Sequence, residues 1–171
     1  MRQQSRRVSH MANPRWLDAR QQRLWRAYLD LNQHLSALLE DQLLQDSGLS
    51  GADYKVLVPL SEAATGVIRA RDLCLQIGWD RSRLSHHLRR MEQRGLVVRE
   101  ECSEDARGTM VRLTDAGRRA IEGAAPQHVE NVQRYFFETL SKRELETLST
   151  VFERLLEKVG NAKTSGEEVS P

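Results

Sequence analysis

Residues 81–99 read RSRLSHHLRRMEQRGLVVR, and residues 105–117 read DARGTMVRLTDAG. In the first stretch, apolar residues recur at helical spacing, which predicts a helix with one buried side; they are Leu84, Leu88 and Met91. Asp80 can accept hydrogen bonds from the first free N–H groups of such a helix, and Gly95 can end it. We therefore expect a short amphipathic helix over residues 81–94.

A β-hairpin is expected directly after this helix. Leu96–Glu100 and Thr109–Leu113 are rich in β-branched residues, and the polar segment Ser103–Gly108 can join them as a turn. A short helix is expected before it, over Arg71–Ile77, with Gly78 at its end. Two short helices joined at a glycine thus lead straight into a two-stranded ribbon.

Further helices are expected on both sides of this unit. Ser50 and Asp53 have the spacing of a capping box, which predicts the start of another short helix. Long helices are expected over residues 15–45, 114–140 and 141–159, each with an apolar stripe. These stripes are more than one small unit can cover. The simplest partner is the same set of helices in a second copy of the chain, which predicts a homodimer.

The expected fold is mainly α with a small β-hairpin, an α+β arrangement. A compact unit over residues 47–114 is inserted between long helices over residues 14–46 and 115–160, which form the dimerisation region. Both ends of the chain lack apolar periodicity. Residues 1–13 are expected to be a disordered basic arm and residues 161–171 a disordered tail.

The bulk composition excludes several classes of protein. The chain has 171 residues, of which 39% are hydrophobic and 29% are charged. No apolar run approaches the roughly 18 residues needed to span a bilayer, and the basic start has no apolar stretch of a secretory signal behind it. We expect a cytoplasmic protein with no membrane partner.

No metal, cofactor or catalytic site is predicted. Cys74 and Cys102 have neither the CxxC spacing nor the neighbouring histidines of a metal site. They are interpreted as ordinary reduced thiols, although Cys102 is expected near an exposed turn, which leaves a redox sensor as an alternative. No histidine or serine stands in a nucleophile-elbow, P-loop or zinc-protease context, so no enzymatic activity is expected.

Positive charge is concentrated locally, although the formal net charge is only +2. Arginines crowd residues 79–99, which suits binding of a polyanion on one face. In a helix-turn-helix the second helix enters the major groove of DNA and presents its polar side to phosphates and base edges. The candidate contacts on this helix are Arg81, Ser82, Arg83, Ser85, His86, Arg89 and Arg90. His87 lies nearer the buried side and fits a packed core histidine better than a base contact.

The hairpin supplies a second candidate contact. Arg107 is expected near its tip, where an exposed arginine on a narrow ribbon can enter the minor groove. Asp105 stands close enough in sequence to hold that guanidinium in position.

The sequence resembles the MarR family of winged helix-turn-helix regulators. Residues 105–117 resemble the wing signature of that family, Asp-x-Arg-Gly followed by Leu113-Thr114 and by Gly117 near the start of the next helix. Residues 81–99 are similar to its recognition helix and first wing strand. The resemblance extends over Trp16–Val159 and identifies residues 47–114 as a winged helix-turn-helix DNA-binding domain.

The resemblance implies several functional properties. Members of the family are homodimers that bind short, near-palindromic operators in double-stranded DNA and mostly act as repressors. Many release DNA when a small aromatic or anionic effector binds between the dimer helices and the winged unit. Arg107 corresponds to the minor-groove arginine, Asp105 to its support, and Ser82, Arg83 and His86 to leading contacts. The candidate ligand-binding residues are Trp16, Arg20, His34 and Tyr54.

Three other interpretations remain open at this point. A helical protein-interaction module could use the basic face to bind an acidic partner. A thiol-based redox-sensing regulator of the same family is a second alternative, although the expected first helix has no cysteine near its start. A winged-helix metal sensor is the third, and it lacks the necessary Cys/His cluster.

Overall fold

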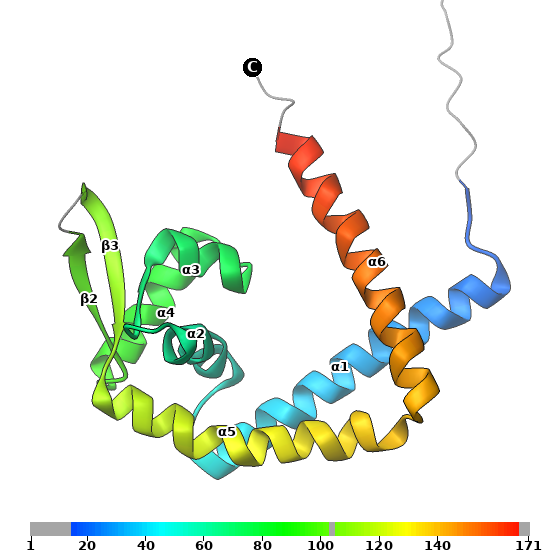
Figure 1. Ribbon diagram of the computed structural model, residues 1–171, viewed down its shortest axis with the longest axis horizontal. Coiled ribbons are helices and arrows are strands. Elements are labelled where there is room, and N and C mark those ends of the chain that lie inside the picture. The colour runs from blue at the N-terminus through cyan, green and yellow to red at the C-terminus, as the bar shows by residue number, and fades with distance from the viewer. Residues whose placement is uncertain (1–14, 103–104, 168–171) are drawn as a thin grey trace, which may run out of the picture. The chain divides into compact units, whose positions relative to one another are not determined.

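The computed structural model describes residues 15–102 and 105–167, with no side-chain detail at residues 102, 105–107 and 162–167. Figure 1 shows the order of the elements along the chain. They are α1 (Ala19–Ser47), α2 (Gly51–Glu62), β1 (Val67–Arg69), α3 (Ala70–Ile77), α4 (Arg81–Gln93), β2 (Val97–Cys102), β3 (Asp105–Leu113), α5 (Asp115–Tyr135), the short 3-10 helix η1 (Phe137–Thr139) and α6 (Lys142–Glu167). The chain divides into two compact units, one ending at Ser36 and the other beginning at Ala37.

Local residues explain where α2 and α4 begin and where α3 ends. The Ser50 hydroxyl accepts from the N–H of Asp53, and the Asp53 carboxylate accepts from the N–H of Ser50, which completes the predicted capping box. Gly78 ends α3 with φ of 67°, a left-handed conformation that glycine adopts without steric cost. Asp80 then caps α4 by accepting from the N–H of Arg83 at 2.8 Å. These three predictions are confirmed.

The small sheet has one strand more than the predicted hairpin. β1 pairs with β3 and β3 pairs with β2, all antiparallel, so the sheet order is β1-β3-β2. Val67 lies opposite Arg112 and Val97 lies opposite Leu113. The sequence indicates an extended segment at β1, but a three-residue segment carries no signal of its pairing partner.

The predicted turn over Ser103–Gly108 is too long. β3 already begins at Asp105, which pairs with Cys102, and the register shifts between Glu101 and Cys102. Strand preference depends strongly on context, so backbone pairing along a ribbon can override a polar, turn-like composition. The ribbon therefore extends further than the residue types alone indicate.

The hydrophobic core lies within the second unit and holds α4 on one side. Its largest fully buried side chains are Leu49, Val56, Leu57, Leu60, Leu73, Leu84, Leu88, Met91, Val97 and Val111. They come from the α1–α2 connection, the three short helices and the sheet. Residues of α4 thus belong to the same core as the strands that follow it, which fixes this helix relative to the ribbon.

Each of the three predicted long helices differs from the structure at one end or both. The helix predicted over residues 15–45 begins at Ala19 and ends at Ser47. Thr114 caps α5 as expected, but α5 ends at Tyr135 and η1 precedes Leu140. α6 has the expected capping box at Ser141 and Glu144, yet it continues to Glu167 rather than ending at residue 160. A glycine inside a helix costs only about 1 kcal/mol, and the residues after Gly160 include helix formers, so the predicted start of the tail is wrong. The predicted arm over 1–13 and residues 168–171 lie outside the described residues.

No helix among the described residues is long and apolar enough to cross a membrane. Large hydrophobic side chains are instead exposed along α1 and α6. Examples are Leu24 (72% exposed), Leu31 (53%), Leu155 (53%), Leu156 (71%) and Val159 (57%).

Candidate nucleic-acid interface

α4 presents a polar, cationic side to solvent. The predicted buried residues Leu84, Leu88 and Met91 are at most 1% exposed. All of the predicted contact residues of this helix are exposed; they are Arg81, Ser82, Arg83, Ser85, His86, Arg89 and Arg90. The helix therefore combines an anchored apolar side with an open side that can donate hydrogen bonds to phosphates and base edges.

Trp79 packs its ring face against one of these arginines, Arg83. It lies in the connection between α3 and α4 and is 9% exposed. The guanidinium carbon of Arg83 lies 4.3 Å from the centroid of the Trp79 ring, which is a cation–π contact. Sequence reasoning did not assign Trp79 a role, because no local pattern tells which side chain will lie over an aromatic ring.

His87 is buried beneath a second arginine. The side chain is 7% exposed, and its Nδ1 accepts a hydrogen bond from Nη2 of Arg90 at 2.8 Å. Its Nε2 lies 3.0 Å from Oδ1 of Asp53, without the alignment of a full hydrogen bond. His87 is thus a packed, hydrogen-bonded core residue, as its position near the buried side of the helix predicted.

Asp53 joins α2 to α4 through charged contacts. Asp53 is 2% exposed, and its carboxylate accepts from Nη1 of Arg94 at 2.6 Å, while Nη2 of Arg94 donates to the Gly48 carbonyl at 3.0 Å. Burial acts to raise the pKa of Asp53, but hydrogen bonds from Arg94 and Ser50 outweigh it and the pKa is lowered. The sequence indicated Asp53 as a capping residue and missed its contacts with α4, which are distant along the chain.

The pKa values of one buried and one partly buried histidine predict a loss of stability in mild acid. Burial lowers the pKa of His87, assisted by Arg90 and opposed by Asp53, and burial also lowers the pKa of His128. The unfolded chain then binds protons more readily below about pH 6.5. We expect the free energy of unfolding to fall from pH 7 toward pH 5, by at most about 1.4 kcal/mol per pH unit for each histidine. Urea midpoints measured across this range for the wild type and H87Q check this. An equal pH slope for both proteins would contradict the assignment to His87.

Arginine–carboxylate pairs brace the β2–β3 ribbon. Arg99 on β2 pairs with Glu92 of α4 at 2.6 Å, and Arg112 on β3 pairs with Glu100 on β2 at 2.7 Å. The Glu92 carboxylate also accepts from the N–H of Arg99 at 2.9 Å, which ties the start of the ribbon to α4. The ribbon and the helix are therefore held together by directional contacts as well as by the core.

The predicted wing contacts lie partly outside the described atoms. Asp105 and Arg107 both belong to β3, so Arg107 is on a strand rather than in a loop. The side chains of both residues lie outside those that the structure describes. Their proposed contact with each other and with the minor groove stays a prediction.

A hollow of about 360 Å³ lies among α3, α4 and the ribbon. It is lined by Arg69, Ala70, Arg71, Cys74, Arg81, Leu84, Ser85, Leu88, Arg99, Gly108 and Thr109. Guanidinium groups together with Ser and Thr hydroxyls are donors for an anionic group such as a DNA phosphate. Of the polar side chains in this set, sequence reasoning had singled out Arg81 and Ser85. The others come from α3 and the strands, and only the fold brings them to α4.

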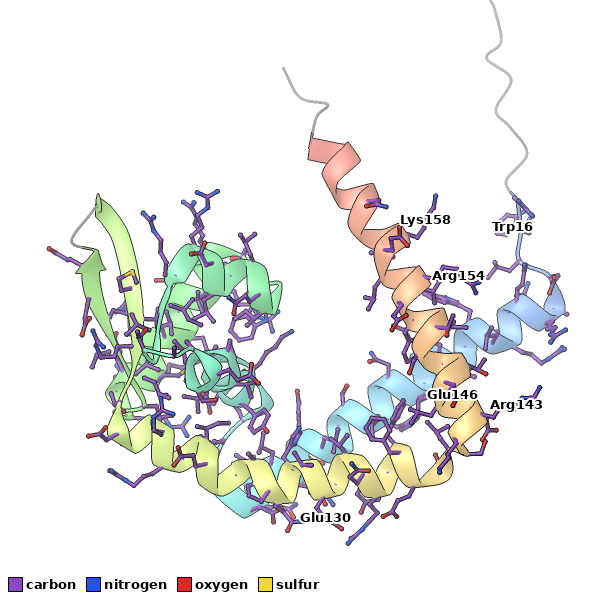
Figure 2. The ribbon with its side chains drawn as sticks, viewed as in Figure 1. Trp16, Glu130, Arg143, Glu146, Arg154 and Lys158 are labelled. Carbon is purple, nitrogen blue, oxygen red and sulfur yellow. The ribbon has the colours of Figure 1, made fainter. Side chains whose placement is uncertain are left out.

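The candidate ligand-binding residues belong to two different units. Trp16 is 81% exposed on the segment before α1 (Figure 2), and Arg20 and His34 are exposed on α1. Tyr54 of α2 is partly buried and packs against His128 of α5, with ring centroids 4.4 Å apart. The structure thus places Tyr54 in a contact between helices, and the ligand-binding role of all four residues remains a prediction.

The described residues hold no cluster of His, Cys, Asp and Glu side chains suited to a metal ion. Cys74 is buried, and burial raises the pKa of its thiol. A buried thiol with a raised pKa forms little of the reactive thiolate. This disfavours Cys74 as a redox sensor, while the side chain of Cys102 lies outside those described.

Comparison with known proteins gives a consistent result. The sequence profile of the MarR family matches residues 47–108. The uncharacterized HTH-type transcriptional regulator YdgJ of Bacillus subtilis (strain 168) is 30% identical over 115 residues, 67% of this chain and 68% of that protein. The transcriptional repressor MprA of Escherichia coli (strain K12) is 25% identical over 134 residues, 77% of this chain and 75% of that protein.

A solved structure shows the same fold. The MarR family transcriptional regulator Sco3205 from Streptomyces coelicolor, in complex with DNA, matches with a TM-score of 0.82 and 35% identity. The match covers 86% of this chain and 92% of that one. With an exposed arginine-rich helix, a braced β-ribbon and these relatives, the resemblance found in the sequence is confirmed: the chain belongs to the MarR family of DNA-binding transcriptional regulators.

Proposed function

We propose that this protein is a sequence-specific repressor that binds a near-palindromic operator as a homodimer in the cytoplasm. The observation that carries the proposal is α4, whose exposed side holds arginines while its other side is anchored in the core. Two such helices in a dimer suit successive major grooves on one face of the duplex. Similarity to the repressor MprA supports repression over activation.

The ribbon and the hollow beside α4 supply additional contacts in this proposal. Arg107 on β3 enters the minor groove with Asp105 as its support, and Arg71 and Arg81 beside the hollow hold a backbone phosphate. Release of DNA by a small aromatic or anionic effector is part of the proposal. Tyr54 of α2 contacts His128 of α5, so an effector bound at Tyr54 would act on a contact between a DNA-binding helix and α5.

Substitution of an arginine at the centre of the exposed side of α4 tests the DNA contact. Arg89 lies opposite the buried stripe of α4, so R89A should weaken operator binding by roughly 1–3 kcal/mol, the usual effect of losing one arginine contact. R143A, at the exposed start of α6 (Figure 2), removes the same charge away from α4 and should have little effect. Fluorescence anisotropy with labelled duplex DNA measures both. Equal losses for the two variants, or no loss for R89A, would contradict the proposed interface.

Salt dependence distinguishes this function from an acidic-protein-binding module. Phosphate contacts release condensed counterions, so the logarithm of the DNA binding constant should fall linearly and steeply as the logarithm of salt concentration rises. The slope should be smaller for R89A if Arg89 contacts a phosphate. If the protein does not bind random duplex DNA even at low salt, the protein-interaction alternative is favoured.

The exposed apolar residues of α1 and α6 support the homodimer. Leu24, Leu155 and Leu156 are more than half exposed in the single chain, and large exposed apolar side chains that recur along a helix are typical of a protein–protein contact. The two helices belong in part to different units, and each presents its own apolar stripe. A second copy of the chain is the simplest partner that covers both stripes.

A charge placed in the α6 stripe tests dimerisation. L155D should raise the dimer dissociation constant at least about tenfold, because an unpaired buried charge is costly. T150D adds the same charge about 140° around the helix from Leu155, at an exposed position, and should leave the dimer intact. Sedimentation velocity over a range of concentrations measures both variants. A wild-type dissociation constant for L155D would contradict the assigned dimer surface.

A further inference from the structure

Two of the exposed arginines on α4 are held from below by buried aromatic or imidazole rings. Arg83 lies over the face of Trp79 at 4.3 Å, and Arg90 donates to Nδ1 of His87 at 2.8 Å. The two supporting rings also touch each other edge-to-face, with centroids 5.4 Å apart and planes at 86°. Both supports are at least nine-tenths buried, whereas both arginines are exposed.

Core packing alone does not explain a histidine at position 87. The neighbouring buried positions of α4, Leu84, Leu88 and Met91, are apolar, and a leucine could fill this place. A buried imidazole costs desolvation free energy, so its polar contacts must offset that cost. Its distinctive contact is the acceptor that Nδ1 offers to Arg90, because an arginine can only donate.

The negative charge of Asp53 favours the ring tautomer that this contact requires. With Nδ1 accepting, the proton of the neutral ring is on Nε2, which lies 3.0 Å from the Asp53 carboxylate. Arg94, the C-terminal cap of α4, also pairs with that carboxylate; its Nη1 lies 2.6 Å from Oδ2 of Asp53. The charged groups facing His87 are thus Asp53 from α2 and Arg90 and Arg94 from α4 and its cap.

An arginine that is already oriented loses less side-chain entropy when it binds a rigid, charged partner. We propose that Trp79 and His87 are positioning residues, which set the DNA affinity of α4 by orienting Arg83 and Arg90 without touching DNA themselves. The inference rests on the proposed contact of these arginines with DNA. Buried residues that do not contact DNA, including Asp53 on α2, would then also affect the DNA affinity.

A double-mutant cycle tests the His87–Arg90 pair. The probe is the duplex that the wild-type protein selects from a random-sequence library, and dissociation constants are compared for wild type, H87L, R90A and the double variant. We expect H87L to weaken binding about fivefold, because the Arg90 side chain then has to be ordered when DNA binds, and to add nothing once Arg90 is absent. H87Q keeps an acceptor for Arg90 and should restore affinity to within about twofold of wild type.

The outcomes separate this inference from the proposed interface. If H87L weakens binding equally with and without Arg90, His87 acts only through folding, and the positioning role is wrong while the interface stands. If R90A itself leaves affinity unchanged, the proposed contact of Arg90 with DNA fails, and the positioning role fails with it. Failure of H87Q to restore affinity also contradicts the role of the acceptor.

The Trp79–Arg83 pair provides an independent second cycle. W79L removes the ring face and should weaken binding by a similar factor in the wild type but not in R83A. W79F keeps a buried ring and should retain most of the affinity. Thermal unfolding of every variant at one protein concentration shows which proteins are folded at the temperature of the binding assay. A loss in W79L that persists in the R83A background would overturn the role assigned to Trp79.

Discussion

Substituting Gly117 by alanine is expected to lower the free energy of unfolding by about 3 kcal/mol, at the upper end of what overpacking costs. Gly117 is buried in the first turn of α5, where a Cβ atom would overlap the Leu96 carbonyl oxygen. The same atom would lie 2.8 Å from Cδ1 of Leu113. Most of the clash is with backbone, which a rotamer change cannot relieve.

The backbone at Leu96 has little freedom to move away. Its carbonyl oxygen accepts from the N–H of Thr114 at 3.2 Å, and the Thr114 hydroxyl lies within hydrogen-bond distance of the carbonyl oxygens of both Gly95 (2.6 Å) and Leu96 (3.0 Å). The same hydroxyl accepts from the N–H of Gly117 at 2.9 Å and caps α5. A displacement of Leu96 would therefore disturb the junction between the ribbon and α5, which explains why a glycine follows the ribbon at this spacing.

A matched control is present on the same helix. A Cβ at Gly123 would meet nothing within 4 Å, so G123A should stabilise the protein by roughly 0.5–1 kcal/mol through helix preference. Urea midpoints at one protein concentration compare the two variants with the wild type, because dimerisation makes stability depend on concentration. Equal midpoints for G117A and the wild type would show that α5 does not approach Leu96 this closely.

Removal of the Asp53 carboxylate should lower the free energy of unfolding by a similar amount. Asp53 is 2% exposed, and its carboxylate contacts the N–H and hydroxyl of Ser50, the guanidinium of Arg94 and the ring of His87. Breaking a buried ion pair typically costs 3–5 kcal/mol. Because the Arg94 side chain is 45% exposed and can rehydrate, we expect about 3 kcal/mol for D53A.

The stability of D53A also has an internal control. Asp46 is exposed near the end of α1, so D46A should change the free energy of unfolding by less than about 0.5 kcal/mol. D53N keeps the shape and an acceptor oxygen, and it should fall between D53A and the wild type. Denaturation by urea at neutral pH measures all three variants. A D53A protein as stable as D46A would contradict the structural role of this network.

The features that sequence predicted correctly are those with local physical causes. Asp80 and Thr114 cap the helices that follow them because each carries a short oxygen-bearing side chain at the right position. Gly78 takes positive φ where a tight connection needs it. The exposed side of α4 follows from helical periodicity alone, so its candidate contact residues could be named before the fold was seen.

The features that sequence missed depend on contacts between distant residues. The pairing of β1 with β3 joins segments far apart along the chain, and so does the contact of Arg94 with Asp53. Composition also misled where context decides, because polar residues pair within β3 and Gly160 lies inside α6. The positions of Arg69, Arg71 and Arg99 around the hollow required the complete fold.

Two copies of α4 are expected to read one duplex at successive major grooves. Selection of bound sequences from a random-sequence duplex library by the purified protein tests it most directly. We expect an enriched inverted repeat with half-sites centred about 10 base pairs apart, and loss of that enrichment for R89A. Recovery of unenriched duplexes, or of a single half-site without symmetry, would contradict the account.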